Sequence, residues 1–123
     1  MTETADVTLR RLTALAVGLP CLALWLIGAG LHPHAAGHGT HTDLGLPACS
    51  TMMFSGHPCP TCGMTTAFAH VTHGQLIQAI VVQPAGAAFA LAVAAAICIS
   101  GYVVISGRAV AHRLAALWQP ITL

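Results

Sequence analysis

The chain has 123 residues, of which 56% are hydrophobic and only 6% are charged, and its formal net charge is +1. A soluble domain normally carries charge on roughly a quarter of its residues, so this composition excludes an ordinary water-soluble surface and indicates a membrane protein. The chain has four Arg and no Lys, and the arginines lie near its two ends. They form no basic face, which excludes nucleic acid as a partner.

The first predicted element is a transmembrane helix over residues 12–31, preceded by a polar tail at residues 1–11. A stretch of this length without charge covers the roughly 30 Å hydrocarbon core of a bilayer at about 1.5 Å per residue. A cleaved signal peptide is the alternative, because Arg10 and Arg11 precede the apolar stretch. We favour a retained anchor, since the stretch is longer than the roughly 7–15 apolar residues of a signal peptide and contains Trp25 near its end.

Residues 32–48 are rich in Gly, Pro and His and have no apolar periodicity, which predicts a loop. Imidazole is a good ligand for zinc and copper, so four clustered histidines raise the hypothesis of a metal site. They are His32, His34, His38 and His41. We favour a polar linker, because their spacing is irregular and ordering the loop around an ion would cost backbone entropy.

Two short amphipathic helices are predicted next, over residues 62–73 and 75–82, with Gly74 between them. Each has an apolar face opposite a face of His, Thr or Gln. Placing these polar side chains among lipids is costly without protein partners. The two helices therefore suit the membrane interface better than the centre of a bilayer.

A second transmembrane helix is predicted over residues 84–106. It begins at Pro84, whose fixed φ and missing N–H are tolerated in a first helical turn. Residues 107–123 combine basic and apolar side chains and include Trp118, which predicts an amphipathic tail at the membrane surface.

The positions of the arginines predict the orientation in the membrane. All four lie outside residues 12–107, and the long segment 32–83 has none. The positive-inside rule then places both termini in the cytoplasm and segment 32–83 on the exoplasmic side, which for a bacterial inner (plasma) membrane would be the periplasm. On that side thiols meet oxidising conditions and external metal ions.

The densest reactive cluster is the sequence Cys59-Pro60-Thr61-Cys62-Gly63. Two thiols at this spacing can share a tetrahedral ion, and Pro and Gly favour the tight turn that this requires. Cys49 can supply a third sulfur. A histidine can complete the site, and the candidates are His57, His70 and His73. Zinc is the preferred ion, ahead of copper.

Two other hypotheses use the same sulfurs. In the first, Cys59 is an attacking thiolate at a helix N-terminus and Cys62 resolves the mixed disulfide, which would make the protein a membrane thiol–disulfide oxidoreductase. In the second, the cysteines form a passive disulfide in a structural subunit. The sequence leaves enzyme and non-enzyme open, and Cys21 and Cys98, inside the predicted spans, are interpreted as small apolar fillers.

These residues resemble a known family. Cys49, the run from Gly56 to Thr65 with its Cys-Pro-x-Cys-Gly-x-Thr core, and the Gln83-Pro84 pair before an apolar span are similar to a family of small bacterial membrane proteins catalogued as domain of unknown function 2752. The resemblance implies an integral membrane protein in which Cys59, Cys62 and Gly63 are important. The chain departs from the family pattern at three positions where relatives have Arg, Asp and Asn: Thr66, Gln75 and Gln83.

Together, these observations predict an all-α integral membrane protein with two transmembrane helices, an exoplasmic Cys/His-rich loop and short interfacial helices. The predicted role is that of an accessory or binding protein with a zinc-like site at the Cys-Pro-x-Cys-Gly turn. Its expected partners are the lipid bilayer and, because the part outside the membrane is small, another membrane protein.

Overall fold

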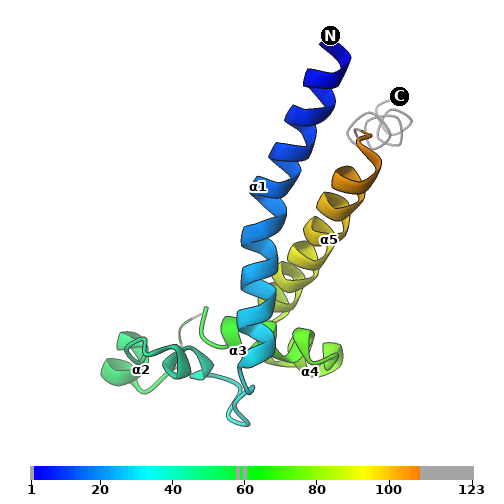
Figure 1. Cartoon of the computed structure of the whole chain (residues 1–123). Helices are drawn as coiled ribbons and strands as arrows, with labels where there is room; N and C mark the ends of the chain where they lie inside the picture. Colours follow the sequence, from blue (N-terminus) through cyan, green and yellow to red (C-terminus); the bar gives the residue numbers. More distant parts are fainter. Residues whose placement is uncertain (1, 58, 60, 109–123) are drawn as a thin grey trace, which may run out of the picture. The chain divides into compact units, whose positions relative to one another are not determined.

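The computed structural model describes residues 2–57, 59 and 61–108. Within this part of the chain the regular elements are all helices, which confirms the predicted all-α class (Figure 1). In chain order they are α1 (Thr2–Gly30), the 3₁₀ helix η1 (Thr40–Leu44), α2 (Ser50–Ser55), α3 (Met64–Thr72), α4 (Leu76–Val82) and α5 (Pro84–Ser106). The amphipathic tail predicted for residues 107–123 lies outside the described residues from position 109 onward.

Two of these helices, α1 and α5, are long and apolar enough to cross a membrane, as predicted. The mean hydropathies of their apolar 18-residue windows are 2.1 and 2.4. The 23 residues of α5 extend about 34 Å at 1.5 Å per residue, slightly more than the hydrocarbon core of a bilayer. Helix α5 begins at Pro84, the residue from which the sequence predicted it.

Helix α1 begins at Thr2, ten residues before the first residue of the predicted span, so the described residues of the polar segment continue the helix. Arg10 pairs with Asp6 across one helical turn at 3.0 Å, and the Thr8 hydroxyl donates to the Thr4 carbonyl at 2.9 Å. Both contacts link positions four residues apart on one helix face and support the helical conformation. The first turns of α1 are therefore a polar extension of an apolar helix.

The chain divides into two compact units. The first contains residues 1–22 and 95–123, so its described part pairs the start of α1 with the end of α5. The helices approach closely where Gly18 faces Ser100: a Cβ on Gly18 would lie 2.8 Å from the Ser100 Cβ. A larger residue at position 18 would separate the two helices.

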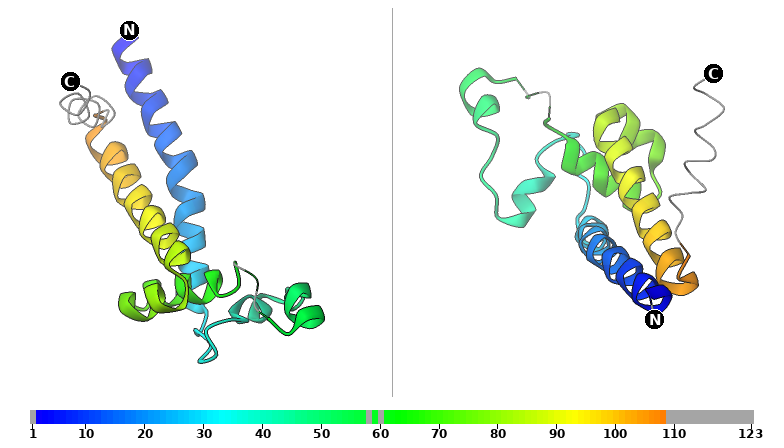
Figure 2. Two further views of the ribbon diagram at one scale, coloured as in Figure 1. Left: turned by 180° about the vertical axis from the view of Figure 1, so that it is seen from behind. Right: turned by 90° about the horizontal axis from the view of Figure 1, so that it is seen from above.

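The second unit, residues 23–94, contains all the short helices. Helix α3 packs against α4 and η1, and it lies between α2 and α4 in Figure 1 and in both views of Figure 2. Phe68 of α3 is buried, with its ring centroid 6.1 Å from that of Trp25 and 6.0 Å from that of Phe89. Helix α3 is thus the centre of this unit and a fixed support for the cysteine turn that precedes it.

Candidate metal centre

The cysteine turn is a short run of tight backbone bends that ends in α3. The Cys62 N–H donates to the Cys59 carbonyl at 2.9 Å, and the Met64 N–H donates to the Thr61 carbonyl at 3.2 Å. Gly63 then precedes the first residue of α3 with φ at 89°. Glycine adopts this left-handed conformation without steric cost, which is the role that the sequence suggested for Gly63 in a metal-binding turn.

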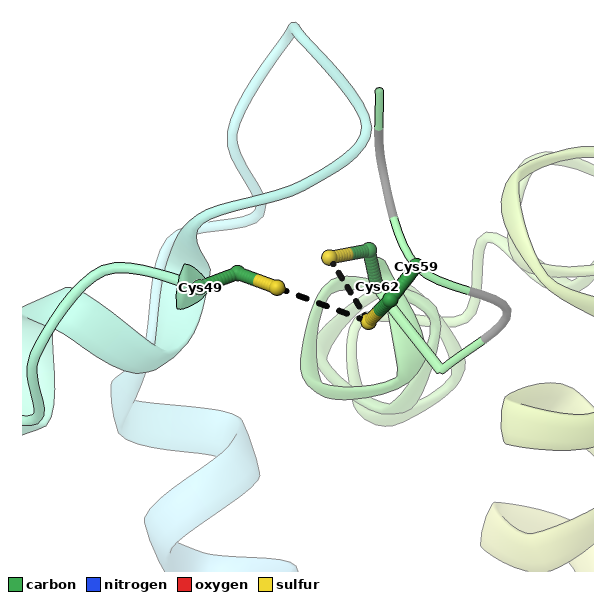
Figure 3. A group of neighbouring side chains, drawn as sticks. All are labelled: Cys49, Cys59 and Cys62. Atoms are coloured by element: carbon green, nitrogen blue, oxygen red, sulfur yellow. Dashed lines mark hydrogen bonds between the residues drawn. The ribbon is translucent and has the colours of Figure 1, made fainter. Parts of the chain in front are cut away.

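The third thiol comes from the start of α2. Cys49 occupies the N-cap position of that helix, and its carbonyl accepts from the Met53 N–H at 3.1 Å. In Figure 3 the side chains of Cys49, Cys59 and Cys62 point toward one another. The Cys59 Sγ lies 3.5 Å from the Cys49 Sγ and 3.2 Å from the Cys62 Sγ.

This arrangement suits a metal ion that prefers sulfur. The three Sγ atoms lie within 4.8 Å of one another, and all three side chains are half-buried. A tetrahedral zinc with Zn–S bonds of about 2.3 Å holds its sulfurs about 3.8 Å apart, so small movements would fit the cluster around zinc. All three cysteines are free, and the Sγ separations exceed the roughly 2.05 Å of an S–S bond, so the hypothesised disulfide is absent from this structure.

Hydrogen bonds within the cluster separate the pKa values of its thiols. The Thr61 hydroxyl, followed by the Cys62 and Cys49 side chains, lowers the pKa of Cys59 from 9.0 to about 6. The Cys62 thiol is hydrogen-bonded to the side chains of Cys59 and Cys49, and these hydrogen bonds raise the pKa of Cys62 to about 11. The pKa of Cys49 is lowered, chiefly by the backbone N–H of Met52. These hydrogen bonds therefore favour the thiolate form at Cys59 and the protonated form at Cys62.

The three histidines considered as a fourth ligand hydrogen-bond elsewhere. His57 Nδ1 lies 2.9 Å from the Ser55 carbonyl, His70 Nδ1 lies 2.6 Å from the Gln75 side-chain oxygen, and His73 Nε2 lies 2.9 Å from the Leu31 carbonyl. Within the described ranges, the cysteine cluster is the one set of three or more His, Cys, Asp or Glu side chains with ligand atoms this close together, and no histidine joins it. The identity of the fourth ligand stays a prediction.

A pocket that the sequence did not predict lies beside the cysteines. Its lining includes Cys49 and Cys62, Met52 of α2, and the loop histidines His38 and His41. These histidines belong to residues 32–48, the segment predicted to be a polar linker. The sequence feature that could have indicated a bend around His38 is the Gly-His-Gly triplet at residues 37–39. Glycines on both sides of a histidine indicate a turn in which the backbone can adopt a positive φ.

Comparison with known proteins agrees with the resemblance seen in the sequence. A family model described as a protein of unknown function, DUF2752, matches residues 49–97. The predicted family is thereby confirmed over this segment. The DUF2752 segment starts at Cys49 and so contains all three cysteines of the cluster, α3, α4 and the first half of α5. No curated protein and no solved structure matches the chain significantly.

Proposed function

We propose that the protein is a small membrane-anchored metal-binding protein that holds one zinc-like ion at Cys49, Cys59 and Cys62 on the exoplasmic side of a bacterial inner membrane. The observation that carries this proposal is the convergence of three sulfurs from two separate segments. Its role would be that of an accessory or binding protein that acts with another membrane protein.

Burial supports insertion into a membrane. In the most apolar windows of α1 and α5, only 6% and 17% of the residues are buried inside the protein. The core helix of a soluble domain would be mostly buried, because exposed apolar surface costs about 25 cal/mol per Å² in water. In a bilayer, lipid chains cover these faces instead, and the helices satisfy their backbone groups internally.

Arginine positions support the proposed orientation. Arg10 and Arg11 lie on α1 before its apolar part, and Arg108 follows α5, whereas the segment between the two helices has no Arg or Lys. The positive-inside rule then puts the cysteine cluster on the exoplasmic side.

The ligand chemistry supports zinc. Three thiolates with one further position match the four-coordinate sites in which zinc takes Cys and His ligands. Copper(I) also prefers sulfur, but zinc is the more common ion in sites that combine a Cys-x-x-Cys pair with a histidine.

Metal analysis of the full-length protein, purified in detergent under reducing conditions, tests the proposal. We expect one zinc per chain in the wild type and at most a small fraction of that in Cys59→Ser and Cys62→Ser. Cys98→Ser is the matched control and should retain the metal, because Cys98 lies in α5, outside the cluster. Wild-type protein that has all its thiols intact but does not bind added zinc would overturn the proposal.

The split in pKa values favours thiol–disulfide exchange as a second candidate. The Cys59 thiolate would attack a partner's disulfide, form a mixed disulfide and release one partner thiolate. Cys62 would then lose its proton and attack the Cys59 sulfur, which displaces the second partner thiolate. The Cys59 and Cys62 thiols would lose two electrons, which reduce the partner's disulfide. A partner trapped on Cys59 in Cys62→Ser, together with metal-free wild type, would favour this candidate.

A further inference from the structure

A pocket of about 170 Å³ opens beside the cysteine cluster. Two of the three cysteines, Cys49 and Cys62, contribute to its lining, and so do His38 and His41 of the loop between α1 and α2. A zinc ion bound by three sulfurs has one remaining position, and a neutral imidazole nitrogen is a common ligand there. The pocket therefore places histidines, a suitable kind of ligand, beside the sulfur cluster.

Two contacts fix this loop against the cysteine turn and α3. A Cβ placed on Gly63 would lie 2.6 Å from the carbonyl oxygen of Gly37, so the two backbones touch at this point. Three residues further along the loop, the Thr40 hydroxyl lies 2.7 Å from the Thr66 hydroxyl, and both side chains are fully buried. His38 is held between these two anchors.

His38 lies in a bend of this loop, and its ring has no other partner in the part of the chain that the structure describes. The glycines on either side of it, Gly37 and Gly39, have φ values of 75° and 93°, so His38 lies in a bend outside any helix. Within the described residues, its ring makes no hydrogen bond or ion pair. His34, in the same loop, is instead paired with Asp43 at 3.2 Å, and His41 lies inside η1.

We infer that His38 is the fourth ligand of the metal centre and completes a Cys₃His site with Cys49, Cys59 and Cys62. This inference rests on the proposed metal-binding function. In the structure, His38 lines the pocket but is not part of the close sulfur group, so the proposed site requires a movement of the Gly37–Gly39 bend that brings a His38 ring nitrogen to the ion. The loop that contains His38 then closes over the open side of the cluster.

Cobalt(II) tests this inference, because its visible absorption reports the number of sulfur and nitrogen ligands in a tetrahedral site. The reduced full-length protein in detergent is titrated with Co²⁺, and zinc is then added in competition. For His38→Ala we expect the d–d bands of bound cobalt to shift and the affinity for Co²⁺ to fall at least about tenfold. Loss of a residue that only hydrogen-bonds to a metal ligand already lowers metal affinity by about this factor. The matched controls His41→Ala and His73→Ala should keep both the wild-type spectrum and the wild-type affinity.

The variant His38→Cys provides a gain-of-signal test that does not depend on a loss of binding. It replaces the imidazole with a fourth sulfur, so the sulfur-to-cobalt charge-transfer band should gain intensity by about one third. Wild-type spectra in His38→Ala, or an unchanged charge-transfer band in His38→Cys, would overturn the assignment of His38. Failure of the wild type to bind Co²⁺ or Zn²⁺ would overturn the proposed function itself, so the two failures are distinguishable.

Discussion

The hydroxyl groups of Thr40 and Thr66 lie 2.7 Å apart, and neither side chain is exposed to solvent. This contact joins η1 to α3 across 26 residues of sequence, and the backbone N–H of His34 also donates to the Thr40 hydroxyl at 3.2 Å. The pair thus attaches the histidine loop to the helix that supports the cysteine turn. An unsatisfied buried hydroxyl is costly, so the contact should set the position of the whole loop.

Thr66→Val should therefore destabilise the protein by about 1–3 kcal/mol, because it removes the buried Thr40–Thr66 hydrogen bond and leaves the Thr40 hydroxyl with only the His34 N–H as a partner. Thermal or denaturant unfolding in detergent, followed by circular dichroism, measures this change. Thr42→Val is the control: it removes an exposed local hydrogen bond to the Gly39 carbonyl and should change stability by less than about 0.5 kcal/mol. Equal effects of the two substitutions would show that the buried pair does not hold the loop.

Gly63→Ala should disrupt the metal centre, since two independent constraints act at this position. Its φ of 89° disfavours any side chain by about 1–2 kcal/mol, and the new Cβ would lie 2.6 Å from the Gly37 carbonyl oxygen. Gly56→Ala is matched in φ, at 70°, but has nothing within 4 Å of its Cβ. Zinc affinity should fall clearly in Gly63→Ala and much less in Gly56→Ala. The reverse order would be incompatible with contact between the loop and the turn.

Alkylation of the reduced, metal-free protein should follow the separated thiol pKa values. Iodoacetamide, with the products located by mass spectrometry, should modify Cys59 with a midpoint near pH 6 and Cys62 only well above pH 9. Thr61→Val should move the Cys59 midpoint upward, because the Thr61 hydroxyl makes the largest contribution to its lowered pKa. A Cys59 midpoint near 9 in the wild type would show that the hydrogen bonds of the cluster do not form in solution.

The same pKa values give a sign for the pH dependence of stability. Cys59 has a lowered pKa in the folded state, so its contribution is complete above pH 9 and is lost as the pH falls through 6. Cys62 has a raised pKa, so its contribution is complete below pH 9 and is lost as the pH rises through 11. The reduced, metal-free cluster should accordingly stabilise the fold most near pH 9, which unfolding measured from pH 5 to 11 can check.

The proposed orientation predicts which thiols a membrane-impermeant maleimide can reach in intact bacterial cells. After mild chelation and reduction, Cys59 should be labelled before lysis, because segment 32–83 is placed on the exoplasmic side. A cysteine introduced by Ala5→Cys near the start of α1 should be labelled only after lysis. If reduced Cys59 were labelled only after lysis and the cysteine at position 5 before lysis, the protein would have the opposite orientation and the proposed orientation would be wrong.

The long helices were predictable because their signals are local. Pro84 predicted the start of α5, and an uncharged stretch long enough to cross a bilayer needs no information from the rest of the chain. The extension of α1 toward the N-terminus was not predicted, because residues 1–11 were interpreted only as a polar tail before the span. The Asp6–Arg10 pair shows that polar residues at helical spacing continue the helix.

The surroundings of the cluster could be predicted only in part. Cys59 and Cys62 are close in sequence, so their proximity follows from the turn between them. By contrast, the contacts Thr40–Thr66 and Gly37–Gly63 join residues 26 positions apart, and no periodicity or local motif encodes them. The six residues of α2 are too few to show a hydrophobic pattern. The pocket that contains His38 became evident only once these distant segments had been brought together.

The central claim is that three sulfurs of this chain bind one metal ion. X-ray absorption at the zinc edge of the loaded full-length protein tests it most directly. The account predicts three sulfur neighbours at about 2.3 Å and one nitrogen at about 2.0 Å. A shell of oxygen and nitrogen atoms with no sulfur would contradict it.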